Sequence, residues 1–126
     1  MTNPKSQIPN PKLVIAKASF VRMSPRKLRL VARSIDKLAP EKAVAYLKLI
    51  DKRAAKPIMQ VLQQAIANAK NNLAISPGDL ITESVQVLDG PRGAKRMDKG
   101  HGARFNRGIK RRKLSHILVR LAVKEK

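Results

Sequence analysis

The chain has 126 residues, and its 28 lysines and arginines against eight aspartates and glutamates give a net charge of +20 at pH 7. Such an excess of charge repels itself and is relieved by a polyanion that releases its counterions on binding, so nucleic acid is the first partner we predict. The sequence has no apolar run near the roughly 18 residues needed to span a bilayer, no secretory-type apolar region after Met1, and no cysteine, which excludes disulfides and thiolate metal sites.

Residues 1–11 contain three prolines and few apolar side chains, which is typical of a flexible leader. Residues 12–126 are expected to form a single domain, because this length and a hydrophobic content of 43% suit a modest core. The first element of that domain is a strand over residues 12–23, indicated by the apolar run Leu13-Val14-Ile15 and by Phe20 and Val21.

A helix is predicted to follow this strand. Ser24 can cap a helix, and Pro25 stands at the first helical position, where proline is favoured. The face predicted to be buried consists of Leu28, Val31, Ala32 and Ile35. The cations on the other faces, which meet solvent or a polyanion, are Arg26, Lys27, Arg29 and Arg33.

Two further helices are predicted from apolar residues at helical spacing, one over residues 40–50 and a longer one from about Lys52 to Leu73. The spaced residues of the first are Ala43, Val44, Leu47 and Ile50. Those of the second are Ala54, Ile58, Val61, Leu62, Ala65, Ile66, Ala69 and Leu73, and we interpret this stripe as core. The turn Ser76-Pro77-Gly78-Asp79 then ends the helical part of the chain.

The most cationic segment covers residues 92–113, where ten of 22 residues are lysine or arginine and Asp98 is the only acid. Strand formers bracket it at residues 85–88 and 117–121, so we predict a basic β-hairpin arm over residues 89–114. Pairing Val87 with Ile117 places the apex at residue 102 and gives an arm on the order of 50 Å. A ribbon of this kind is marginally stable alone, so its outer half needs a partner.

Aromatic side chains are scarce, since the chain has only two phenylalanines, one tyrosine and no tryptophan. Proteins that read single-stranded bases use several aromatic platforms. We therefore expect contacts to phosphates and to nucleic-acid shape to dominate, with base stacking as a minor mode.

Four ordered blocks of the chain resemble the large-subunit ribosomal protein twenty-two family, at matching separations over about residues 13–123. The blocks are residues 21–31, residues 65–72, the stretch from Asp89-Gly90-Pro91 to Lys95-Arg96, and Ser115-His116-Ile117. The resemblance implies an α+β fold in which three helices pack on a small three-stranded antiparallel sheet, with a long protruding basic β-hairpin. It also implies a structural, non-enzymatic protein of the large ribosomal subunit.

The same resemblance implies the partners and the sites. The partners are 23S-type large-subunit rRNA, neighbouring large-subunit ribosomal proteins, and the nascent polypeptide in the exit tunnel, whose wall the hairpin would form in part. No cofactor, metal, membrane or homo-oligomer is expected, and the location is the cytoplasmic ribosome or an organellar one. Together with the charge pattern, the resemblance assigns rRNA binding to Arg22, Ser24, Arg26, Lys27, Arg29, Arg33, Arg92, Lys95, Arg96, Lys99, Arg104, Arg107, Lys110, Arg111, Arg112, Lys113 and His116. The tunnel-lining tip is assigned to Arg96, Met97, Lys99, Gly100, His101, Gly102 and Arg104.

The chain departs from the family in the arm. Three residues, Arg92-Gly93-Ala94, separate Gly-Pro from Lys-Arg where the family usually has two, and residues 97–104 replace the usual tip. Transfer of roles is therefore best supported for residues 24–29, 95–96 and 113–117. His116 alternates with apolar residues on its strand, which favours a hydrogen-bonded structural histidine over a catalytic one.

Two other functional classes fit the sequence less well. An architectural DNA-binding protein with basic β-arms would need an apolar wedge at the arm tip, and Gly100-His101-Gly102 supplies none. An enzyme would need a phosphate-binding glycine loop or clustered histidine and carboxylate, and the eight acids are dispersed.

Overall fold

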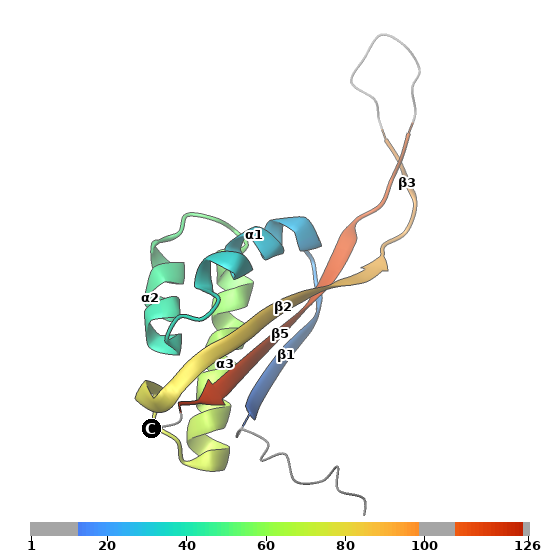
Figure 1. Ribbon diagram of the computed structural model, residues 1–126. Coiled ribbons are helices and arrows are strands. Elements are labelled where there is room, and N and C mark those ends of the chain that lie inside the picture. Colours follow the sequence, from blue (N-terminus) through green and yellow to red (C-terminus); the bar gives the residue numbers. More distant parts are fainter. Residues whose placement is uncertain (1–12, 99–107, 125–126) are drawn as a thin grey trace, which may run out of the picture.

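The computed structural model describes residues 13–98 and 108–124 (Figure 1). In this part of the chain it has three α-helices and a three-stranded antiparallel sheet of order β1-β5-β2, which confirms the predicted α+β class. The elements in chain order are β1 (Leu13–Val21), α1 (Pro25–Ile35), α2 (Pro40–Leu49), α3 (Ala55–Leu73), a 3₁₀ turn (Pro77–Asp79), β2 (Leu80–Arg92), β3 (Arg96–Met97), β4 (Ile109–Lys110) and β5 (Lys113–Val123). Strands β3 and β4 form a separate antiparallel pair farther out along the arm.

The helices pack on one face of the sheet, with α3 against β1 and β5 and α1 against β2. Because successive strand residues point to opposite faces, only alternate residues of each strand reach this core. The predicted buried face of α1 is confirmed, since Leu28, Val31, Ala32 and Ile35 are all buried. The largest side chains that lose all contact with solvent are Leu28, Ile35, Ile58, Leu62, Leu80, Ile117 and Leu121.

Helix α1 begins as predicted at Pro25, but its cap differs from the expectation. Ser24 occupies the N-cap position, yet its hydroxyl makes no capping hydrogen bond. The Ser24 carbonyl instead accepts the backbone amides of Lys27 (3.1 Å) and Leu28 (3.3 Å). Proline at the first helical position removes one of the amides that a cap would otherwise satisfy.

The third helix starts at Ala55, three residues later than predicted, because the chain turns at residues 53–54 and the Lys52 carbonyl accepts the Ala55 amide at 2.9 Å. Its predicted core stripe holds except at the end, where Leu73 is 41% exposed. The helix stops there because Ala74 adopts a left-handed conformation and donates its amide to the Ala69 carbonyl. The second helix ends at Leu49, one residue before the predicted end.

The predicted register of the arm base is confirmed, because Val87 pairs with Ile117 in the β2–β5 ladder. The outer edge of β2 is covered by α1 and the loop that follows it. The Thr82 amide donates to the Leu38 carbonyl (3.2 Å), and the Val85 amide donates to Asp36 Oδ1 (3.1 Å). These contacts satisfy edge groups that would otherwise be open to pairing with another chain.

Beyond the sheet the two strands continue outward as a narrow ribbon (Figure 1). In the register of Val87 with Ile117, Arg96 would face Gly108, whereas it pairs with Lys110. The β2 side therefore carries two more residues than the β5 side, one where the ladder shifts between Asp89 and Arg92 and one between Arg92 and Arg96. The extra residue noted at residues 92–94 falls in this region, and Gly93 still donates its amide to the Arg112 carbonyl at 2.8 Å.

Candidate nucleic-acid interface

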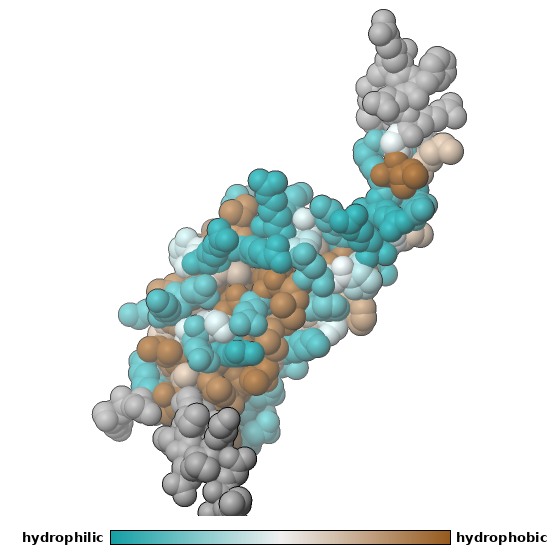
Figure 2. Space-filling view, turned by 45° about the vertical axis from the view of Figure 1, so that its right-hand side comes forward, coloured by the Kyte–Doolittle hydropathy of each residue, from teal (hydrophilic) through white to brown (hydrophobic). Residues whose placement is uncertain are grey.

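A basic cleft of about 980 Å³ lies where the arm leaves the body. Its cations come from the end of β1, from α1, from the turn before α3 and from both sides of the arm: Arg22, Lys27, Arg53, Arg96, Arg111, Arg112 and Lys113. The other lining residues are uncharged: Met23, Ser24, Gly93 and Leu114. Hydrophilic side chains crowd this region in Figure 2, while apolar side chains gather over the body. A cleft lined by like charges without a carboxylate favours an anionic ligand.

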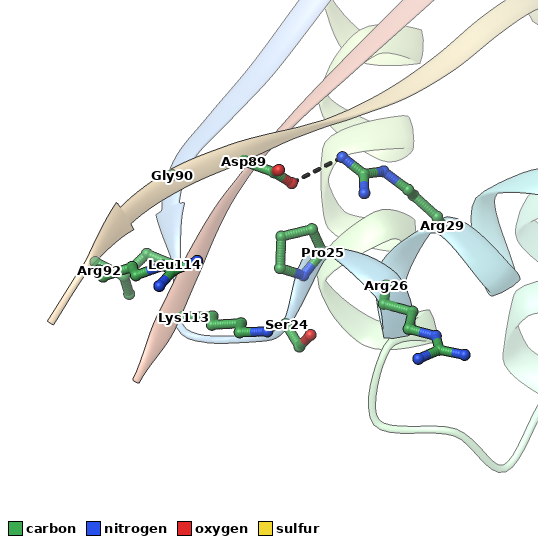
Figure 3. A pocket seen from close by; sticks show the side chains of 9 residues that line it. All are labelled: Ser24, Pro25, Arg26, Arg29, Asp89, Gly90, Arg92, Lys113 and Leu114. Carbon is green, nitrogen blue, oxygen red and sulfur yellow. Dashed lines mark hydrogen bonds and ion pairs between the residues drawn. The ribbon is translucent and has the colours of Figure 1, made fainter. Parts of the chain in front are cut away.

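A smaller cavity of about 160 Å³ lies between the start of α1 and the root of the arm (Figure 3). Four cations line it, namely Arg26, Arg29, Arg92 and Lys113, together with the carboxylate of Asp89. The Arg26 guanidinium points away from Asp89 in Figure 3, so it is free of that carboxylate. The cavity therefore brings cations of α1 and of both strands at the root of the arm around one concave surface.

Arg29 is held within the protein more firmly than its neighbours. Its Nη2 donates to Asp89 Oδ1 at 2.7 Å, and Nε and Nη2 donate to the Val87 carbonyl at 3.3 and 3.2 Å. The side chain is still 45% exposed. Arg29 therefore ties α1 to β2, a role that the charge pattern did not predict, and its contact with RNA stays a prediction.

The outer arm contains a further concave region of about 370 Å³ lined by Arg92, Ile109, Lys110, Arg111 and Lys113. Lys110 Nζ lies 2.6 Å from Asp98 Oδ2 across the β3–β4 pair, and the Asp98 amide donates to the Gly108 carbonyl at 2.7 Å. Asp98, the only acid of residues 92–113, thus joins the two sides of the arm.

The remaining predicted site residues are exposed outside these cavities, half-buried on β5, or outside the described part of the chain. Arg33 and Lys95 are exposed but do not line these cavities, and Met97 is exposed on β3. His116 is half-buried on β5, where Nδ1 accepts the Phe20 amide at 3.1 Å, which confirms the predicted hydrogen-bonded histidine. The predicted residues outside the described part of the chain are Lys99, Gly100, His101, Gly102, Arg104 and Arg107.

Sequence reasoning missed Arg53 as a cleft residue. The apolar spacing predicts a third helix that includes Arg53, whereas this residue lies in the turn before α3 and lines the cleft. The signal that could have found it is local, since Lys52-Arg53 directly follows Asp51 and precedes the first apolar residue of the stripe. Its approach to residues of the arm is a long-range contact that no local pattern encodes.

The described residues offer no other obvious chemistry. Within residues 13–98 and 108–124, no group of three or more histidines, aspartates or glutamates could hold a metal ion. None of the helices in that same part of the chain is long and apolar enough to cross a membrane. The basic cleft and the cavity beside it are therefore the candidate site.

Comparison with known proteins shows what the chain as a whole is similar to. Residues 16–122 match the model of the family described as ribosomal protein L22p/L17e. The chain is 39% identical over 104 residues to the large ribosomal subunit protein uL22 of Mycoplasma capricolum subsp. capricolum, covering 82% of this chain and 91% of that protein. It is also 39% identical over 111 residues to the protein of the same name from Fervidobacterium nodosum, covering 88% of this chain and 74% of the relative. The protein of this name from Thermotoga sp. is 36% identical over 104 residues, covering 82% and 64%.

Proposed function

Because the chain belongs to the ribosomal protein L22p/L17e family, we propose that it is a structural constituent of the large ribosomal subunit that acts in translation in the cytoplasm. Its relatives are ribosomal structural proteins rather than enzymes, so its function lies in binding. The ligand that fits the site is large-subunit rRNA.

The basic cleft is the observation that carries this proposal. Cations that are far apart in sequence, such as Arg22, Arg53 and Arg112, line one concave surface whose lining residues include no carboxylate. In the free protein these charges repel one another, and RNA phosphates would relieve the repulsion while releasing counterions. Phosphate contacts of this kind position a protein on folded RNA without reading its bases.

The arm has a separate role in this proposal. Its basic strands reach away from the core, and none of the helices in the described part of the chain covers them beyond Arg92 (Figure 1). We infer that rRNA surrounds the arm in the subunit and that the hairpin tip forms part of the wall of the peptide exit tunnel, beside the nascent polypeptide. Supporting assembly of the subunit and contacting neighbouring ribosomal proteins belong to the same proposal.

The proposal is tested by the salt dependence of binding to large-subunit rRNA transcribed in vitro. Arg22, Arg53 and Arg112 are replaced together by glutamine; all three are exposed, so the fold should be kept. Each lost phosphate contact reduces the magnitude of the slope of log affinity against log salt by about 0.7 to 0.9. The slope of the triple variant should therefore be smaller in magnitude than that of the wild type by about 2 to 3.

A matched control removes the same charge elsewhere. Lys42, Lys48 and Lys56 are exposed cations of α2 and α3 that do not line the cleft, and their joint replacement by glutamine should leave the slope close to that of the wild type. Equal slopes for the two triple variants would show that binding follows net charge alone and would overturn the cleft as the site. Failure of the wild-type chain to co-sediment with large ribosomal subunits would overturn the wider proposal.

A further inference from the structure

Phe20 lies in an irregular part of β1. The strand pairs regularly with β5 from Leu13 opposite Ala122 to Ala18 opposite Ile117, and pairing resumes with Val21 opposite Ser115. Ser19 and Phe20 thus share a single opposing residue, His116, which defines a β-bulge. Phe20 takes a left-handed backbone conformation with φ of 58°, which is unusual for a bulky residue.

The bulge changes where the Phe20 ring points. Continued alternation would place residue 20 on the helix-packed face with Val14 and Ala16, which are buried. Instead Val21 packs against the core, and Phe20 is 61% exposed. The backbone of β1 therefore adopts an unfavourable conformation that exposes an aromatic ring instead of burying it in the core. Because this arrangement does not stabilise the fold, it points to a role in function.

His116 holds this arrangement. Its Nδ1 accepts the Phe20 amide at 3.1 Å, which satisfies a backbone donor that the bulge removes from the ladder. The two rings also meet edge to face, with centroids 5.0 Å apart and planes at 81°. A neighbour in this geometry leaves ring surface free for a second partner, as the exposure of Phe20 shows.

The surroundings of Phe20 are cationic. Lys17 and Arg22 flank it on the chain, both exposed, and residues 13–24 contain no acid. Arg22 lines the basic cleft, so the ring stands two residues from a side chain that we assign to phosphate contact. An aromatic platform beside cations is the arrangement by which proteins hold single-stranded nucleic acid, because the base stacks while the phosphates are neutralised.

We propose that Phe20 stacks on an unpaired nucleobase of the RNA that occupies the basic cleft, with His116 as the residue that positions the ring. The inference rests on the proposed function and deepens it, because it adds a base contact to a surface that otherwise contacts phosphates. It agrees with the expectation that base stacking is a minor mode, since one exposed ring serves one base.

The first test uses Phe20→Trp, since the natural chain has no tryptophan and the emission would report on this position alone. Adding large-subunit rRNA transcribed in vitro should quench the tryptophan, because a stacked base quenches indole emission. Heparin, a polyanion without bases, should bind and leave the emission nearly unchanged. A Leu49→Trp variant serves as the control, because Leu49 is 84% exposed on α2 and does not line the cleft.

The second test compares affinities. Phe20→Ala and Phe20→Leu should raise the Kd for the same rRNA about 5- to 150-fold, the range expected for one base stacked on an aromatic ring, while Phe20→Tyr keeps the wild-type Kd. The salt slope should stay unchanged in all three, in contrast to Arg22→Gln, which should lower it by about 0.7 to 0.9. Thermal unfolding should be nearly unchanged, because the ring is exposed.

Each outcome separates the possibilities. Wild-type affinity in Phe20→Leu, or a blue shift without quenching in Phe20→Trp when rRNA is bound, would mean that the ring packs on an apolar or protein surface and would overturn base stacking. Unchanged emission with bound rRNA would overturn it as well, while leaving the proposed function standing. Absence of any rRNA binding by the wild-type chain would overturn both.

Discussion

The β2–β5 pair passes through two environments that differ in what holds the backbone together. Between Leu80 and Leu88 one face of the pair lies under the helices, and Leu80, Ile117 and Leu121 are completely buried. From Arg92 outward, nearly every described residue of the ribbon is exposed and many are cationic. Antiparallel pairing is stable in the free protein where apolar side chains are buried against the helices. Where the side chains are exposed and cationic, the same pairing needs a bound ligand to be stable. The basic cleft, the surface best suited to RNA, therefore lies at the base of the arm, where apolar burial no longer stabilises the strand pair.

Amide exchange should show the largest difference between these regions. Both contain backbone hydrogen bonds, including that of the Asp98 amide to the Gly108 carbonyl in the arm. Amides of β5 from Ile117 to Leu121 should open only on global unfolding and be protected at least about 10³-fold more than the Asp98 amide in the free protein. Hydrogen exchange followed by NMR measures both. Similar protection in the two places would show that the arm is a preformed rod rather than a segment ordered by RNA.

Two isoleucines, Ile117 on β5 and Ile109 on β4, give the next comparison. Ile117 has no exposed surface, whereas Ile109 is 66% exposed. Replacing Ile117 by alanine should lower the free energy of unfolding by about 2 to 5 kcal/mol, because the cavity cannot fully collapse. Replacing Ile109 by alanine should change it by less than about 0.5 kcal/mol. Urea denaturation measures both values, and a large loss at Ile109 would mean that the arm belongs to the cooperative core.

Two glycines mark the boundary between the regions. A Cβ on Gly90 would lie 2.8 Å from the backbone carbon and oxygen of Leu114, whereas one on Gly93 would meet Arg112 at ordinary contact distances of 3.5 Å and beyond. Gly90→Ala should therefore force the strands apart and cost about 1 to 3 kcal/mol, as overpacking does.

Gly93→Ala is the matched control for that change. It should cost less than about 0.5 kcal/mol, because neither glycine has a positive φ and Gly93 has room for a methyl group. Thermal unfolding and rRNA affinity should be measured for both variants. An equal cost at the two positions would indicate that glycine flexibility, rather than the close approach at Leu114, is required at the root of the arm.

The smallest effect should come from a buried polar atom in the part of the β2–β5 pair that lies under the helices. Thr82 is fully buried on β2, and its Oγ1 has no hydrogen-bond partner among the described residues. Thr82→Val removes the unsatisfied hydroxyl at nearly equal volume and should raise the free energy of unfolding by about 1 kcal/mol. Ser115→Ala provides the contrast, because Ser115 Oγ donates to the Met23 carbonyl at 2.6 Å and its loss should destabilise the protein. A destabilised Thr82→Val variant would indicate a partner for Thr82 that the fold does not reveal.

Much of the fold followed from local patterns. The helical spacing of Leu28, Val31 and Ile35 predicted a buried face because a side chain every third or fourth residue must share one side of a helix. The basic composition of residues 92–113 likewise predicted an arm, because unpaired charges cannot be buried. The pairing of Val87 with Ile117 was predictable since two strand-forming runs bracket that arm.

Other features depend on contacts between residues far apart in the chain. Arg29 was predicted as one cation among several, and only the approach of β2 to α1 gives it Asp89 and the Val87 carbonyl as partners. Arg53 enters the cleft only because the turn before α3 lies near the arm. In the sequence, Phe20 looks like an ordinary strand residue. Its exposure depends on the bulge between β1 and β5 and on the contact with His116, which lies 96 residues later in the chain. Periodicity and charge are properties of neighbouring residues and can be read from the sequence, whereas bulges and side-chain partners are decided by which distant backbone groups the packed chain leaves unsatisfied.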